Sequence, residues 1–361
     1  MCTKYAEVTL AVHYREINAN GELVGGPMYY IKNGLSKKWH WLAYLFAAFG
    51  VLTVFGTGNA TQVNTITTAI NSALLNYNVI SESAVSTSNL IIGIIIAILI
   101  AMILLGGIKR IGHVTEKLVP IMALFYIIGC VIILVMNASA IPNAFVQIFT
   151  LAFQPQAIAG GVAGVTVQQA MRYGVARGLF SNEAGLGSTP HAHALAKVKQ
   201  PQDQGALAII GVFIDTFVIL TLTALVLITS GLIPEGMTGT ALTQAAFSLT
   251  FGSFGKVFIA ICMLFFAFST IVGWYFFGQA NVKSLLGEKA IKVYSLLVVA
   301  FVAIGSCLKV QLVWDASDMF NGLMVLPNLL ALLALSNLMT RLEKEHMAEE
   351  AAEKAAEHAS K

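Results

Sequence analysis

The sequence has few charged residues. Only 11% of its 361 residues are Asp, Glu, Lys or Arg, whereas 57% are hydrophobic. Soluble domains carry about 25% charged residues, so this composition excludes an ordinary soluble protein and predicts an all-α polytopic membrane protein. The four cysteines are scattered without Cys-x-x-Cys or Cys/His spacing. That spacing favours neither a disulfide framework nor a metal site.

Signatures of catalysis and of nucleic-acid binding are also missing. We find no phosphate-binding loop, no dinucleotide fingerprint and no basic patch with interleaved aromatic residues. Ser188 lies near a histidine, but neither a nucleophile elbow nor a partner acid accompanies it. His191 and His193 are two apart, so on a helix they point in roughly opposite directions. We therefore expect no enzyme, no resident cofactor or metal and no nucleic-acid partner.

Long apolar runs occupy most of the chain. A helix needs about 20 mostly apolar residues to cross a bilayer. The candidate crossings are residues 41–75, 90–108, 118–136, 158–194, 206–230, 257–278, 293–308 and 319–339. Residues 1–14 look like the end of a further helix. Residues 340–361 are rich in Ala, Glu and Lys and predict a charged, solvated helical tail.

Lysine and arginine alternate between the connections of these crossings. They occur in 15–40, 109–117, 195–205, 279–292 and the tail, but are absent from 76–89, 137–165 and 231–255. The connection 309–318 is the exception, with one basic residue, Lys309. Cytoplasmic loops are enriched in basic residues. The alternation requires that residues 158–194 cross the membrane once, and it predicts that the C-terminal tail is cytoplasmic.

The crossing 158–194 is too polar and too rich in glycine for one regular helix. Irregular backbone survives in a membrane only where it is buried in protein or lines a cavity. A break in the stretch Gly178–Ser188 would free carbonyls for a cation and would expose a helix N-terminus to a carboxylate. That arrangement suits a zwitterion travelling with a cation. The alternative is a kinked structural helix held by Asn182 and Glu183.

Two carboxylates, Glu183 and Asp215, are the only ones that we place deep in the apparent crossings. Charged side chains in a membrane usually face the bundle interior and a partner. Arg172 and Arg177 are the nearest candidate partners, and a broken helix could bring Arg177 to Glu183. For Glu183 a structural ion pair and a coupling role are equally open. For Asp215 the structural role is favoured.

Other polar residues give weaker signals. Ser269 and Thr270 are adjacent hydroxyls that could bind Na⁺, although membrane Ser and Thr usually bond back to the i−4 carbonyl. Trp274 could form the wall of a small pocket or simply pack. Gln62 and Asn64 are two apart and do not share a helix face, so interhelical hydrogen bonds are the plainer interpretation.

Several of these stretches together resemble a known family. The segments "GVARGLFSNEAGLGSTP" (174–190), "KVKQPQDQG" (197–205) and "FIDT" (213–216) are similar to the signature of the alanine or glycine:cation (sodium) symporters, the amino acid carrier proteins. The segments "KYAEVTLAVHYR" (4–15) and "GGPMYYIKNGL" (25–35) match the same family in the same order. The similarity extends at least to Trp274.

The resemblance implies a sodium-coupled carrier of a small neutral amino acid, alanine or glycine, in a bacterial or archaeal cytoplasmic membrane. It implies alternating access in a five-plus-five inverted-repeat (LeuT-like) bundle, in which the first helix of each repeat is broken. The sodium ligands would then include Ser269 and Thr270. The implied substrate-binding residues are Gln62, Asn64, Phe180, Ser181, Asn182, Gly185 and Trp274, with Glu183, Arg177 and Asp215 in coupling or structural roles.

The chain departs from the family pattern in two places. Family members carry further helices before the "KYAE" stretch, so the resemblance implies an N-terminally truncated, incomplete copy that lacks the first broken helix and most of the second. A non-transporting membrane partner or remnant is the alternative. His191 and His193 stand where the family usually has small residues. The choice between alanine and glycine, and the oligomeric state, remain open at this point.

Overall fold

The computed structural model describes residues 1–18, 21–104, 106–153, 167–233 and 236–359, and these are almost entirely helical. Within the described part, the strands are β1 (Glu16–Ile17) and β2 (Leu23–Val24), which form a short antiparallel hairpin. Six helical segments are long and apolar enough to cross a membrane: Lys37–Asn76, Glu82–Leu104, Arg110–Met136, Pro201–Thr229, Phe254–Leu286 and Val310–Ala334. This is the architecture of a multi-pass helical membrane protein.

Several helices extend beyond the apolar runs that predict them. Helix α6 (Gly107–Met136) begins well before residue 118, and α14 (Phe254–Leu286) continues past residue 278. Helix α16 (Val310–Ala334) includes most of the stretch 309–318 that we expected to be a turn. A hydropathy pattern detects only the apolar part of a helix, so it does not detect polar helix ends. Part of the expected crossing 158–194 lies outside the described residues.

Two of the long rods contain a π-helical turn. The first consists of α3 (Trp41–Phe55), η2 (Gly56–Ala60) and α4 (Thr61–Asn76), and the second of α11 (Pro201–Phe213), η5 (Ile214–Leu220) and α12 (Thr221–Thr229). A π-turn shifts the backbone hydrogen bonds from i−4 to i−5 and often marks a functional site. Both π-turns carry polar residues, including Thr57 and Asp215.

Helix α14 forms the centre of the bundle. It packs against α3, α4, α6, α13 (Gly239–Phe251) and α15 (Ala290–Gly305). Its residues belong to both of the large apolar clusters, one around Phe46 and Trp274 and the other around Phe247 and Phe258. Helix α5 (Val85–Leu104) instead exposes Ile91 and its apolar neighbours, as a surface facing lipid would.

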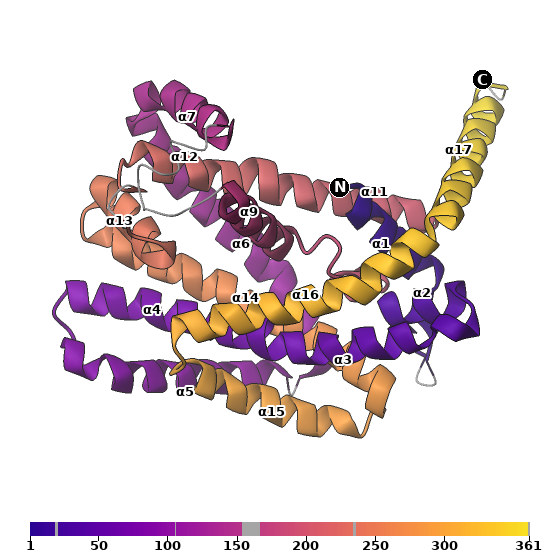
Figure 1. Ribbon diagram of the computed structural model, residues 1–361, viewed down its shortest axis with the longest axis horizontal. Coiled ribbons are helices and arrows are strands. Elements are labelled where there is room, and N and C mark those ends of the chain that lie inside the picture. Colours follow the sequence, from indigo (N-terminus) through magenta and orange to yellow (C-terminus); the bar gives the residue numbers. More distant parts are fainter. Residues whose placement is uncertain (19–20, 105, 154–166, 234–235, 360–361) are drawn as a thin grey trace.

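The termini lie on one side of this bundle. Helix α1 (Cys2–His13) packs along α11 and the short α10 (Pro190–His193), and α9 (Val167–Asn182) contacts η5. Helix α17 (Ser336–Ala359) extends away from the bundle (Figure 1). The remaining elements are α2 (Pro27–Gly34), α7 (Ile141–Phe153) and the 3₁₀ turns η1 (Lys37–Trp39), η3 (Glu82–Ala84) and η4 (Ala138–Ala140).

Candidate functional site

The glycine-rich segment interrupts the helix in the structure. Helix α9 ends at Asn182, and the chain stays non-helical until α10 begins at Pro190. Backbone φ angles are +51° at Glu183, +93° at Gly185 and +78° at Gly187. These left-handed conformations favour glycine and make Glu183 a strained position. The break is therefore built into the local backbone.

The break begins later than the sequence suggests. Gly178 lies inside α9, and a Cβ atom added there would meet no atom within 4 Å. A Cβ at Gly187 would lie 2.7 Å from the Phe46 ring and 2.8 Å from Pro27. Gly187 is thus required by both its φ angle and its neighbours, whereas Gly178 is tolerated in a regular helix. The expectation of an interruption starting at Gly178 was wrong by one helical turn.

Glu7 on α1 holds the amide groups of the break. Its two carboxylate oxygens accept the backbone N–H groups of Gly185 and Gly187, each at 3.0 Å, and the side chain is fully buried. Asn328 on α16 donates from Nδ2 to the same carboxylate at 2.5 Å and to the Gly185 carbonyl at 2.9 Å. The Tyr30 hydroxyl donates to Asn328 Oδ1. The N–H groups of Gly185 and Gly187 therefore do bind an acidic group, and that group is a side chain of the protein itself.

Lys4 holds the opposite, carbonyl end of the break. Its ammonium donates to the Asn182 carbonyl at 3.2 Å and to Thr189 Oγ1, and the residue is only 4% exposed. A cation is favoured where a helix ends in unpaired carbonyls. Lys4 and Glu7 are three residues apart on α1, so one face of that helix presents both charges to the break.

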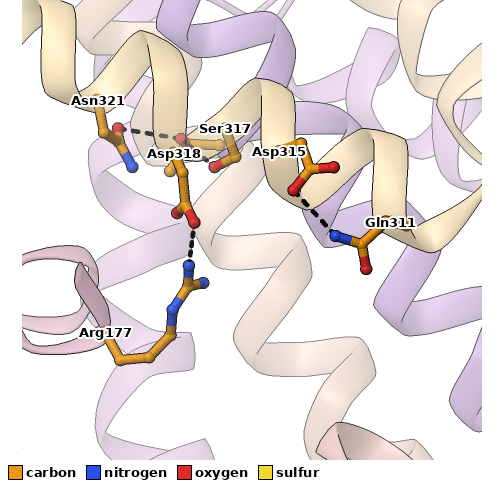
Figure 2. Close-up of polar contacts among 7 residues, drawn as sticks. Arg177, Gln311, Asp315, Ser317, Asp318 and Asn321 are labelled. Carbon is orange, nitrogen blue, oxygen red and sulfur yellow. Dashed lines mark hydrogen bonds and ion pairs between the residues drawn. The ribbon is translucent and has the colours of Figure 1, made fainter. Parts of the chain in front are cut away.

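Glu183 and Arg177 do not pair with each other. The Glu183 carboxylate accepts a hydrogen bond from Ser188. Arg177 forms an ion pair with Asp318 on α16 (Figure 2), and its guanidinium lies 4.6 Å from the centre of the Trp314 ring. Lys4 already places a basic side chain at the break. Arg177 is therefore not needed there and pairs with Asp318 instead.

Three predicted residues come together beside the break. Ser181 Oγ donates to Asp215 Oδ2 at 2.7 Å, and Thr216 Oγ1 donates to Asn182 Oδ1 at 2.8 Å. The π-turn η5 supplies Asp215 and Thr216. A cavity of about 390 Å³ is lined here by Lys4, Ser181, Asn182, Thr189, His193, Leu207, Ala208, Gly211, Val212 and Asp215. Its polar groups thus come from α1, from the end of α9, from the break, from α10 and from η5.

The other predicted substrate residues lie in separate places. Gln62 donates from Nε2 to the Thr57 carbonyl at 2.9 Å, within its own rod. Asn64 donates to the Leu308 carbonyl at 2.8 Å, just beyond α15. Phe180 packs against Trp314, with ring centroids 5.3 Å apart. Asn64 thus makes the kind of contact between segments that the plainer interpretation expects, whereas Gln62 bonds within its own rod and Phe180 packs on another ring.

The hydroxyl pair on α14 makes local bonds. Ser269 and Thr270 both donate to the Phe266 carbonyl, at 2.9 and 2.8 Å. This is the back-bonding alternative, although the hydroxyl lone pairs remain available to a cation, so sodium binding there stays a prediction. Trp274 is 2% exposed, and a Cβ at Gly58 would lie 2.3 Å from its Cβ. Trp274, a residue of α14, therefore packs closely against η2.

The two histidines face different partners. Nε2 of the buried His191 ring lies 3.1 Å from Asn281 Nδ2. Asn281 Nδ2 is the donor, because it also donates to the Phe277 carbonyl. His193 Nδ1 lies 2.7 Å from Gln204 Nε2. The two rings therefore bond to different helices, α14 and α11.

Sequence reasoning missed Glu7, the most deeply buried carboxylate of the site. The search for carboxylates covered only the apparent crossings, and it passed over Glu7 because α1 is too short to be counted as one of them. The i,i+3 spacing of Lys4 and Glu7 was the available signal. A second missed cluster joins η2 to α16: Thr57 Oγ1 lies 2.6 Å from Ser317 Oγ and donates to Asn321 Oδ1 at 3.0 Å. Ser317 and Asn321 are one turn apart on α16 (Figure 2).

Comparison with known families decides the class of protein. The model of the "Sodium:alanine symporter family" matches residues 1–360. The chain belongs to this family. Its members are transporters and not enzymes, and sodium is their coupling ion. The match begins at residue 1 and gives no support to the expectation that the chain is an incomplete copy.

Individual relatives of this symporter family are similar over most of the chain. The sodium/alanine symporter AgcS of Methanococcus maripaludis is 41% identical over 347 residues, which are 94% of this chain and 73% of that protein. The amino-acid carrier protein AlsT of Bacillus subtilis is 36% identical, covering 96% and 70%. The probable sodium/glutamine symporter GlnT of Bacillus subtilis is 37% identical, covering 95% and 69%. Relatives of comparable similarity are thus named for different amino acids.

Proposed function

We propose that this protein moves a small neutral amino acid, alanine or glycine, together with Na⁺ by alternating access across the cell membrane. The break between α9 and α10 is the observation that supports the proposal. Broken helices at the midplane expose backbone groups that hold substrates and coupling ions in secondary transporters. Here the break gathers Lys4, Glu7 and Glu183 in one place. A purely apolar packing function would not need these charges.

The proposed substrate site is the cavity beside the break. Its volume of about 390 Å³ lies within the range of small-ligand pockets. Ser181 and Asn182 would contact the substrate there, while Phe180, Gly185 and Trp274 would join the site after a rearrangement. Ser269 and Thr270 would contribute to sodium binding, while Gln62 and Asn64 would join the site after a rearrangement of their rods.

The same proposal extends to the architecture. The crossings would belong to a five-plus-five inverted-repeat bundle in the cytoplasmic membrane, without its first broken helix and most of its second helix, and with α17 on the cytoplasmic side. The alternation of basic connections and the polar surface of α17 support this orientation. Helix α15 has 16 residues and would cross only with help from its polar flanks.

Glutamine is the second candidate substrate, because a relative named for glutamine is 37% identical to this chain. A glutamine side chain requires more room than a methyl group. The cavity beside the break, at about 390 Å³, has room for either amino acid. An assay in which the two amino acids compete for uptake therefore distinguishes the substrates.

The test is uptake by the purified chain in liposomes. We expect labelled alanine to accumulate when sodium is high outside, and accumulation to stop when choline replaces sodium or an ionophore collapses the gradient. Unlabelled alanine, glycine and glutamine then compete for uptake at equal concentrations. Uptake that ignores the sodium gradient, or no uptake above empty liposomes, would contradict the proposal.

A further inference from the structure

Lys4 already occupies a set of oxygens suited to a cation. Its ammonium bonds to the Asn182 carbonyl and to Thr189 Oγ1. Ser181 and the Asp215 carboxylate line the same cavity. Carbonyl, hydroxyl and carboxylate oxygens are the ligand types that hard cations take, and carbonyls freed by a broken helix coordinate Na⁺ in transporters. The ammonium marks where a positive charge is stabilised.

Acidic oxygens lie close to the oxygens that Lys4 uses. The Asp215 carboxylate lines the same cavity as Lys4 and accepts a hydrogen bond from Ser181. Glu7 holds the amide groups of the adjacent break. Arg177, the arginine nearest to Glu183 in the sequence, is committed to Asp318 on α16. A small cation bound to the Asn182 carbonyl and the Thr189 hydroxyl would therefore have a carboxylate ligand within the same cavity.

We propose that the Lys4 ammonium and a coupling sodium ion, additional to the one proposed at Ser269 and Thr270, exchange on the Asn182 carbonyl and the Thr189 hydroxyl, with the Asp215 carboxylate as a further ligand of the sodium ion. This inference rests on the proposed function. In the sodium-free protein Lys4 is the resident cation. When Na⁺ takes the Asn182 carbonyl, Coulomb repulsion drives the ammonium toward Glu7, one turn along α1. Sodium thereby releases the link between α1 and the end of α9.

A purely structural lysine predicts a different result. If Lys4 only clamps the break, its removal lowers stability equally with and without sodium. If Lys4 competes with sodium, its removal lets sodium bind more tightly. The response to sodium, and not stability alone, therefore separates the two roles.

The experiment compares Lys4→Met with the unaltered chain in thermal unfolding, titrating NaCl against choline chloride at constant ionic strength. We expect the sodium concentration giving half of the maximal stabilisation to fall about tenfold in Lys4→Met. Lys4→Arg keeps a competing cation and should stay within about twofold of the unaltered chain. Lys283→Met is the matched control. Lys283 is paired with Glu22 and Glu288 and lies outside the cavity beside the break. An unchanged midpoint in Lys4→Met overturns the inference.

The exchange can still be tested if Lys4→Met folds poorly. If this variant folds only in sodium, and choline does not replace sodium, the exchange is supported. If no sodium concentration restores folding, the exchange is wrong. The readout needs no transport, so the two proposals fail separately. Sodium-driven uptake by the unaltered chain with an unmoved midpoint in Lys4→Met removes only the exchange, whereas absent uptake removes the proposed function.

Discussion

At the π-turn η2 the displaced backbone groups are satisfied by neutral side chains, whereas in the break after α9 they are satisfied by charges. Thr61 Oγ1 donates to the Gly56 carbonyl at 3.1 Å, and Gln62 Nε2 donates to the Thr57 carbonyl at 2.9 Å. In the break, Lys4 takes the carbonyl end and Glu7 takes the amide end. Both solutions satisfy buried backbone, as the membrane requires. Only the break uses ionisable side chains for this purpose, so only the break is expected to respond to an added ion.

Removing Glu7 should break this comparison most strongly. Glu7→Ala leaves two backbone N–H groups without their acceptor and leaves the buried Lys4 without its nearest carboxylate on α1. Each buried N–H group left without its acceptor costs about 1–3 kcal/mol. We expect a large drop in the thermal midpoint of the detergent-solubilised protein. The exposed Glu22→Ala is the control, and equal midpoints for the two variants would show that Glu7 does not hold the break.

Gly187→Ala should have the next largest effect. The added Cβ would approach Phe46 to 2.7 Å at a φ of +78°, and such strain costs on the order of 1–3 kcal/mol. Gly178→Ala is the matched control, because its Cβ meets open space within a helix. Alanine favours an exposed helix by about 1 kcal/mol over glycine, so this variant should be neutral or more stable. The same direction of change in both variants would contradict the position of the break.

These two glycines show what sequence can decide. Apolar runs predicted where most helices lie, because hydropathy is a property of local composition. The glycine content predicted a break but not its first residue, since only tertiary neighbours separate Gly178 from Gly187. Glu7 and Asn328 meet across 321 positions of the chain. No local pattern contains that contact, and for the same reason the sequence could not decide whether Arg177 meets Glu183, which it does not do in the structure.

A smaller effect is expected at Asn182, whose side chain borders the cavity. Asn182→Ala removes the acceptor of Thr216 and a polar group of the proposed substrate site. We expect the amino-acid concentration for half-maximal uptake to rise about tenfold, equivalent to about 1.4 kcal/mol, with normal membrane insertion. Gln311→Ala removes a surface hydrogen bond to Asp315 and serves as the control (Figure 2). Unchanged uptake kinetics would remove Asn182 from the site.

The smallest effect should come from the neutral cluster at η2. Thr57→Val keeps the shape of the side chain but removes a hydroxyl bonded to Ser317 and Asn321, which costs about 1 kcal/mol. Because this cluster carries no net charge, the sodium titration of thermal stability should keep its midpoint while every curve moves to lower temperature. A shifted sodium midpoint in Thr57→Val would mean that η2 and α16 also take part in ion binding. The presence of charged side chains would then no longer distinguish a helix interruption that binds the coupling ion from one that is only structural.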